Sequence, residues 1–221
     1  MNVRNFITFL TLLFLPAVAF AFGNDASIKA RAEIITAVSD LIYVVSFLIG
    51  LILLVTGGYK LKLISDENQK GNKYGAPAMA ILAGVIIMNC SESLSVLGAT
   101  YLNAEKFCMI VADGSISDSC MNTELVGVTG ELKSRIEKLS SGSTAEAFMD
   151  NIRIIIGIFQ IIGLIYFLVG AYGLYEVANG SSKENGYGKP IITMFASALI
   201  VDIPHTMQIA LDTLEKIGIN F

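Results

Sequence analysis

Apolar residues occur in long blocks along this chain and do not alternate with polar ones. Positions 41–58 read LIYVVSFLIGLILLVTGG and contain no charged residue, and a second long, mostly apolar block covers about 152–175. A helix needs roughly 20 predominantly apolar residues to cross the hydrocarbon core of a bilayer. Each block therefore predicts a membrane-spanning helix.

A shorter apolar block follows each long one, at 77–88 and at 190–201, and each ends at a polar residue, Asn89 or Asp202. A dozen helical residues extend about 18 Å, less than the ~30 Å of the hydrocarbon core. Beyond Asp202 the apolar residues recur at the spacing of an amphipathic helix, which needs a protein neighbour or the headgroup region. They are Met207, Leu211, Leu214, Ile217 and Ile219.

The composition also indicates a membrane protein. Hydrophobic residues make up 54% of the chain and charged residues 15%, whereas about a quarter of a soluble domain is charged. The mean hydropathy is +0.66. The net charge is −4 without a strongly basic patch, so membrane lipids are expected partners and nucleic-acid binding is not predicted.

The first 21 residues have the pattern of a cleavable signal peptide. Arg4 precedes a short apolar stretch at 6–15, Pro16 follows, and Ala19-Phe20-Ala21 matches a cleavage site. An uncleaved membrane anchor is the alternative. Cleavage would place the new amino terminus outside the cytoplasm, as in a protein of the bacterial inner membrane.

Charge in the loop at 59–75 predicts the orientation. This short loop carries four lysines, and the positive-inside rule places such a loop in the cytoplasm. Two crossings per hairpin then leave both chain ends and the polar segment between the hairpins in the periplasm. We predict an all-α membrane protein of four spans, two tandem transmembrane helical hairpins, with a small periplasmic insert. The boundaries are 1–21 for the signal, 22–100 and 151–221 for the hairpins, and 101–150 for the insert.

The chain repeats itself at an offset of 113 residues. KGNKYGAP at 70–77 returns as KENGYGKP at 183–190, so the pattern Lys-x-Asn-x-Tyr-Gly-x-Pro occurs twice. The spans align at the same offset, which predicts duplication of one hairpin. Because each copy crosses twice, the copies have the same orientation and form a parallel repeat.

The repeated turn residues have plausible physical tasks. Proline suits the first turn of a helix, where its missing N–H would be unpaired anyway. Glycine permits a tight backbone entering that helix, and tyrosine favours the membrane interface. These residues are Tyr74, Gly75 and Pro77 in the first copy and Tyr187, Gly188 and Pro190 in the second.

Small residues also recur within the spans. Gly50 and Gly57 are seven residues apart, as are Gly163 and Gly170, so each pair lies on one helix face and allows close helix approach. These glycines either pack each hairpin against itself or form an interface with another subunit.

Few residues suggest chemistry. Asn89 and Asp202 are candidates for lining a pore, because an acid near the end of a span can serve ion or proton movement. Alternatively, Asp202 and His205 are solvated at the periplasmic interface and Pro204 kinks the helix. His205 is the only histidine, which excludes a metal cluster built from several histidines.

Two of the three cysteines lie in the predicted insert. A disulfide between Cys108 and Cys120 would stabilise the chain by roughly 3 kcal/mol in the periplasm; two free thiols, or pairing with Cys90, are the alternatives. Nucleotide-binding and zinc motifs and a nucleophile elbow are missing from the sequence. An enzyme, a cofactor and a metal are therefore not predicted.

A signal peptide, an apolar helix, a basic Gly/Lys turn and a second Ala/Gly-rich helix resemble the pilin-like subunits of conjugative and type IV secretion systems. The duplicated hairpin with an insert looks more like the small polytopic inner-membrane components of type IVB (Dot/Icm) systems, such as the DotE/IcmC family. The resemblance implies a non-enzymatic structural subunit that forms homo- or hetero-oligomers with other secretion-system membrane subunits through its glycine-faced helices. The alternative is a small oligomeric channel or transporter with Asn89 and Asp202 lining its path.

Overall fold

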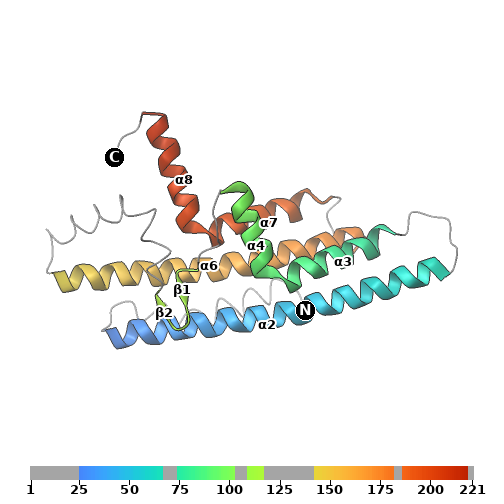
Figure 1. Ribbon diagram of the computed structural model, residues 1–221, viewed down its shortest axis with the longest axis horizontal. Helices are drawn as coiled ribbons and strands as arrows, with labels where there is room; N and C mark the ends of the chain where they lie inside the picture. The colour runs from blue at the N-terminus through green and yellow to red at the C-terminus, as the bar shows by residue number, and fades with distance from the viewer. Residues whose placement is uncertain (1–24, 67–73, 103–108, 117–141, 182–185, 219–221) are drawn as a thin grey trace. The chain divides into compact units, whose positions relative to one another are not determined.

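The computed structural model describes residues 25–66, 74–102, 109–116, 142–181 and 186–218, and most of these are helical. Figure 1 shows the elements along the chain. The long helices are α2 (Asp25–Asp66) and α6 (Gly142–Ala178). The shorter elements are α3 (Gly75–Met88), α4 (Cys90–Tyr101), β1 (Val111–Ala112), β2 (Ser115–Ile116), α7 (Gly188–Val201) and α8 (Ile203–Lys216).

The chain divides into two compact units, and both long helices contribute to each. The first unit comprises residues 1–37 and 110–157, and the second comprises 38–109 and 158–221. Most of each predicted hairpin, residues 38–100 and 158–221, belongs to the second unit. The first unit contains the amino-terminal parts of α2 and α6 and the two short strands.

The two long helices confirm the predicted long spans. Ser27–Ser65 and Phe148–Ala178 are each long and apolar enough to cross a membrane. They differ in how far the protein covers them: 22% of the most apolar window is buried in the first helix and 56% in the second. Within the described chain, the first span therefore leaves most of its apolar surface open.

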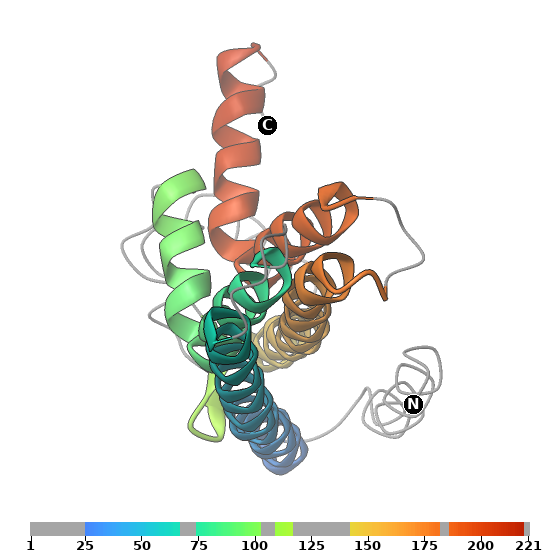
Figure 2. The ribbon, with the colours of Figure 1, turned by 90° about the vertical axis from the view of Figure 1, so that its right-hand side faces the viewer.

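The two short apolar blocks form bent helix pairs. Helix α3 meets α4, and α7 meets α8, at an angle of 90° in each case. Figure 2 shows α4 and α8 turning away from the helices that precede them. The described chain thus has two helices that can cross a membrane, or up to four if each bent pair is one span.

A small β-hairpin lies in the first unit, where the sequence led us to expect only helices. Strands β1 and β2 pair antiparallel, with Val111 opposite Ile116. The turn between them has positive φ angles at Asp113 (51°) and Gly114 (68°), as a two-residue Asp-Gly hairpin turn requires. The Gly114 N–H donates to Thr36 Oγ1 at 3.0 Å, which fastens the hairpin to α2.

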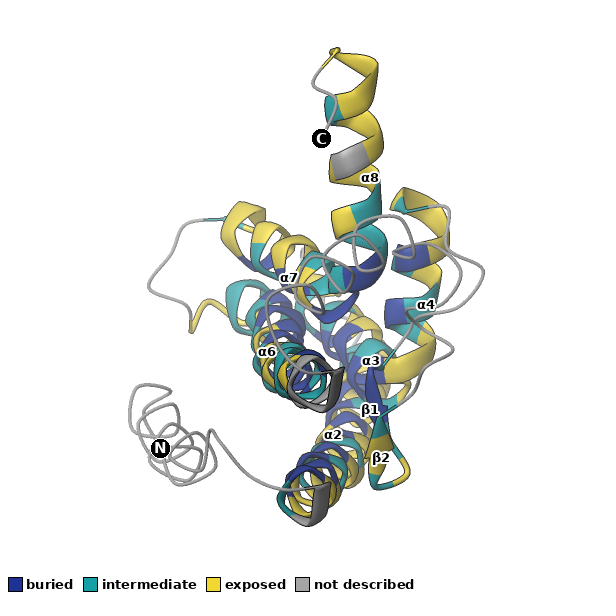
Figure 3. Ribbon diagram, turned by 90° about the vertical axis from the view of Figure 1, so that its left-hand side faces the viewer, coloured by how far each residue is buried: buried dark blue, intermediate teal, exposed yellow. Residues whose placement is uncertain are grey.

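The core of the second unit lies where the bent pairs meet the long helices. One cluster of buried residues joins α4, α6 and α7, and a smaller one joins α2, α3 and α6. Figure 3 shows this burial beside the largely exposed outer turns of α8. The clusters comprise Cys90, Leu94, Leu164, Phe167 and Val201, and Leu53, Ile87 and Ala171.

Candidate functional site at the two helix corners

The two bends have the same backbone geometry. We name the bend at Asn89 the first corner and the bend at Asp202 the second corner. The dihedral angles are φ −108° and ψ 51° at Asn89, and φ −104° and ψ 52° at Asp202. At each corner the backbone N–H still donates to the carbonyl four residues earlier, Val85 O or Ala198 O, at 3.0 Å. The last hydrogen bond of the first helix is therefore kept at the corner residue, and the chain then continues into a second helix at 90°.

Proline does not explain the bends. Pro204 lies in the first turn of α8 and is buried. The first corner has Ser91 at the corresponding position and bends by the same 90°. The expectation that Pro204 kinks a continuous helix is therefore wrong, and proline instead begins the next helix, where it costs no intrahelical bond.

Hydroxyl side chains bridge both bends. Ser93 Oγ donates to Ile86 O at 3.3 Å, and Thr206 Oγ1 donates to Leu199 O at 2.9 Å. Each bond spans seven residues and serves a carbonyl at the end of the preceding helix, where intrahelical partners run out. The hydroxyls therefore fasten the second helix of each pair to the first.

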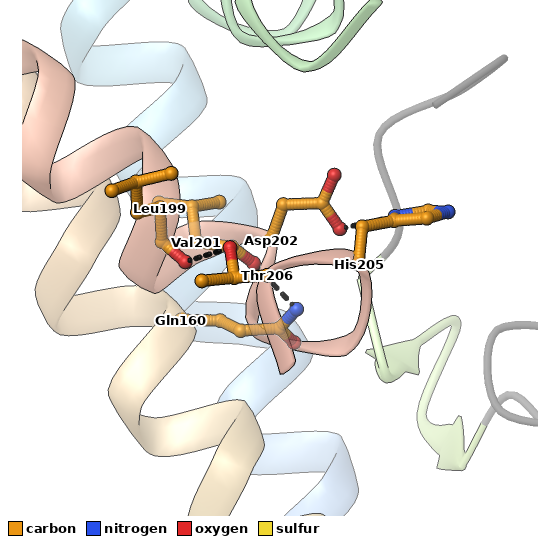
Figure 4. A network of polar contacts seen from close by, with 6 residues as sticks. All are labelled: Gln160, Leu199, Val201, Asp202, His205 and Thr206. Carbon is orange, nitrogen blue, oxygen red and sulfur yellow. Dashed lines mark hydrogen bonds and ion pairs between the residues drawn. The ribbon is translucent and has the colours of Figure 1, made fainter. Parts of the chain in front are cut away.

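The second corner has an additional buried donor. Gln160 of α6 is fully buried, and its Nε2 donates to Val201 O at 2.7 Å. Figure 4 shows this bond beside the Thr206 bond. A buried carbonyl without a partner costs about 1–3 kcal/mol, so Gln160 stabilises the bend. The first corner has Phe47 at the corresponding position, which cannot donate such a bond.

Asp202 is buried, which corrects the expectation that it is solvated. Only 2% of the residue is exposed, and Oδ1 lies 2.7 Å from His205 Nδ1 (Figure 4). Gly98 of α4 lies beside the other oxygen: a Cβ on Gly98 would stand 3.5 Å from Asp202 Oδ2. A cavity of about 10 Å³, close to the volume that one water needs, is lined there by Gly98, Tyr101, Phe195 and Asp202 among others.

The two candidate pore residues do not share a cavity. Asn89 is exposed and lines an open, mostly apolar groove of about 460 Å³ with Tyr43, Phe47 and Met88. Asp202 lines the small cavity at the other corner. Within one copy of the chain, these residues therefore belong to separate sites.

The span glycines pack each hairpin against itself. A Cβ on Gly50 would lie 2.5 Å from the backbone N of Met88 and 2.6 Å from Gly84 O. A Cβ on Gly163 would lie 2.8 Å from Val201 Cγ2 and 3.1 Å from Ser197 O. The other pair behaves alike, with Gly57 against Ile81 and Gly170 against Met194. The glycines thus pack each hairpin against itself, which is one of the two alternatives, and assembly with another subunit through them stays a prediction.

The repeated turn residues lie at the start of α3 and α7. Tyr74 and Tyr187 precede the helices and are exposed, while Pro77 and Pro190 are buried in the first turns. The two glycines begin the helices without a positive φ, and no atom lies within 4 Å of a Cβ built on either. The conformational freedom of glycine is therefore not used at these two positions. They are Gly75 and Gly188.

Cys108 and Cys120 lie outside the described residues, so their predicted disulfide stays a prediction. Cys90 is a free thiol buried in the core of the second unit. The alternative in which Cys90 pairs with another cysteine is therefore wrong.

Gln160 and Arg31 are among the buried polar residues that sequence reasoning missed. Gln160 interrupts an apolar block, and that interruption was the available signal. Arg31 of α2 is 8% exposed and donates from Nη1 to Asn151 Oδ1 of α6 at 2.9 Å. Together with the bond from Gly114, this contact ties the elements of the first unit.

The described residues include no group of three or more His, Cys, Asp or Glu side chains placed to hold a metal ion. Comparisons with protein-family models, with curated proteins and with solved structures found no match to this chain. The helix corners and the exposed apolar surface are therefore the features of this chain that bear on its function.

Proposed function

We propose that this protein is a non-enzymatic structural subunit of a membrane assembly, built from two copies of one bent hairpin. The equivalence of the two corners carries the proposal. They agree in backbone angles, in the seven-residue hydroxyl bridge and in the 90° bend. Two folded copies of one motif, in one orientation, are suited to packing beside each other and beside further copies.

Helix packing inside the hairpins supports the duplication. Gly50 meets Met88 and Gly84, and 113 residues later Gly163 meets Val201 and Ser197, which are the corresponding positions. The second glycine pair repeats this agreement. Apolar composition alone would not place the same neighbours against the same glycines.

The exposed apolar surface supports a membrane setting with further partners. In α2, several large apolar side chains are more than half exposed, which is costly in water and favourable in lipid or against another subunit. They include Leu41, Val44, Ile52 and Val55. With the basic turn and the signal pattern, this favours a multi-pass protein of the bacterial inner membrane whose insert and termini are periplasmic.

The secretion role comes from the resemblance of the sequence to components of type IV secretion and conjugation systems. In such an assembly the chain would scaffold the inner-membrane part, and partner ATPases would supply energy. Deleting the gene should abolish protein or DNA transfer, and the wild-type gene should restore it. Unchanged transfer in a strain that lacks this gene and keeps the other genes of the apparatus would contradict the role.

A channel is the second candidate, favoured by the buried contact between Asp202 and His205. Both side chains lie at the end of an apolar helix, where an ionisable group is a candidate for ion movement. On this view Asp202→Asn should abolish ion flux in proteoliposomes and leave assembly intact. On the structural view, flux is at background in both proteins.

A further inference from the structure

Helix α4 covers the second corner of its own chain. Leu94 of α4 is only 2% exposed. The Tyr101 ring packs edge-on against Phe195 of α7, with ring centroids 4.8 Å apart. Gly98 lies beside the Asp202 carboxylate. This contact of α4 with α7, within one chain, covers Asp202 at the second corner.

The corresponding surface of α3 is uncovered. Leu82 and Val85 occupy the positions that Phe195 and Ala198 have in α7, 113 residues later. Leu82 is 48% exposed and Val85 is 44% exposed. Asn89, at the corner itself, is exposed as well. Among the described residues, no helix covers this face of α3, which corresponds to the face of α7 on which α4 packs.

The corresponding surface of α8 is also uncovered. Met207 is the counterpart of Leu94, and it is 49% exposed where Leu94 is buried. Leu214 is the counterpart of Tyr101 and is partly exposed. The described part of the chain thus has one contact of this kind, α4 on α7, and it has two uncovered surfaces, on α3 and on α8, that could form a second one.

We propose that the occupant of the exposed α3 face is α8 of a second copy of this chain, packed as α4 packs on α7. The pair Leu82–Leu214 then replaces the pair Phe195–Tyr101. Such an interface is head-to-tail, and repetition closes into a ring or continues as an open row. The inference rests on the duplicated hairpin and deepens the proposed assembly role by naming the surface and the partner.

Cysteine cross-linking in the native membrane tests this interface. Two differently tagged copies are co-expressed with Cys90, Cys108 and Cys120 changed to Ala, one carrying Leu82→Cys and the other Leu214→Cys. The internal reference is Tyr101→Cys with Phe195→Cys in one chain. The matched control pairs Leu82→Cys with Ile209→Cys, because Ile209 is the counterpart of Val96, a 64% exposed residue of α4.

We expect the cysteine pair at 82 and 214 to form a disulfide between the two tagged copies. The control pair at 82 and 209 should form none. If the internal 101–195 disulfide forms and 82–214 does not link two copies, the proposal is overturned. A photo-crosslinker at position 82 of the otherwise unmodified chain decides the matter if the cysteine-free chain fails to fold. Capture of a second copy through α8 supports the proposal, whereas capture of only lipid or of a different protein overturns it.

The same strains separate this inference from the proposed function. If gene deletion abolishes transfer and no 82–214 disulfide forms, the secretion role is retained and self-association through α8 is rejected. A specific link together with normal transfer after deletion would retain self-association and reject the secretion role.

Discussion

Substituting Gly50 by alanine tests the helix contact on which the first hairpin depends. The new Cβ would lie 2.5 Å from Met88 N, 2.6 Å from Gly84 O and 2.8 Å from Met88 Cα, all of them backbone atoms. Backbone cannot rotate away as a flexible side chain can. Relief to an ordinary contact of 3.4 Å requires α2 and α3 to separate by nearly 1 Å at this point.

Such a separation has a calculable cost. A gap of 0.5–1 Å forfeits about a quarter to a half of each dispersion contact, and overpacking of a well-packed core typically costs about 1–3 kcal/mol. The control is Gly58→Ala in the same helix, where no atom lies within 4 Å of the Cβ. Alanine there stabilises a helix by roughly 0.5–1 kcal/mol relative to glycine. Both variants receive this gain, which therefore cancels between them, and we expect them to differ by about 1–3 kcal/mol, the cost of overpacking.

Reversible unfolding in detergent micelles, followed by circular dichroism as the fraction of denaturing detergent rises, measures this difference. Gly50→Ala should unfold earlier than wild type, and Gly58→Ala at the same point or later. Equal midpoints for the two variants would refute the packing of α2 on α3 at Gly50.

Three further predictions concern the corners and the β-turn. Gln160→Leu should cost about 1–3 kcal/mol in the same unfolding assay because it leaves Val201 O buried without its donor; wild-type stability would contradict that bond. Gly114→Ala should cost about 1–2 kcal/mol, since φ is +68° there, and an unchanged unfolding midpoint would contradict the turn. His205→Ala should destabilise the chain more than Asp202→Asn, because it leaves a buried carboxylate without this partner; the reverse order would contradict the contact.

The long helices were predictable because their signal is local. An uncharged stretch such as 41–58 has few alternatives to a span, whatever surrounds it. The amphipathic continuation after Asp202 was also readable, and α8 confirms it as a helix. The Asp113-Gly114 pair carried a hairpin signal that was overlooked.

The corners were predictable only as the places where apolar blocks end. Their 90° bends depend on partners distant in sequence or in space, such as Gln160 for the carbonyl of Val201. The burial of Asp202 depends on α4 packing across α7, a tertiary contact that no periodicity reports. For the same reason, spacing identified the face of Gly50 without indicating whether α3 or another subunit would occupy it.

The central claim is that one bent hairpin occurs twice in the same orientation. Single cysteines at positions 74, 187 and 115, in a chain without its native cysteines, test it with a membrane-impermeant thiol reagent on intact and on opened cells. All three positions are exposed in the described structure. We predict that 115 reacts in intact cells and that 74 and 187 react only after opening. Labelling of 74 and 187 from opposite sides of the membrane would contradict the parallel repeat and the assembly that we derive from it.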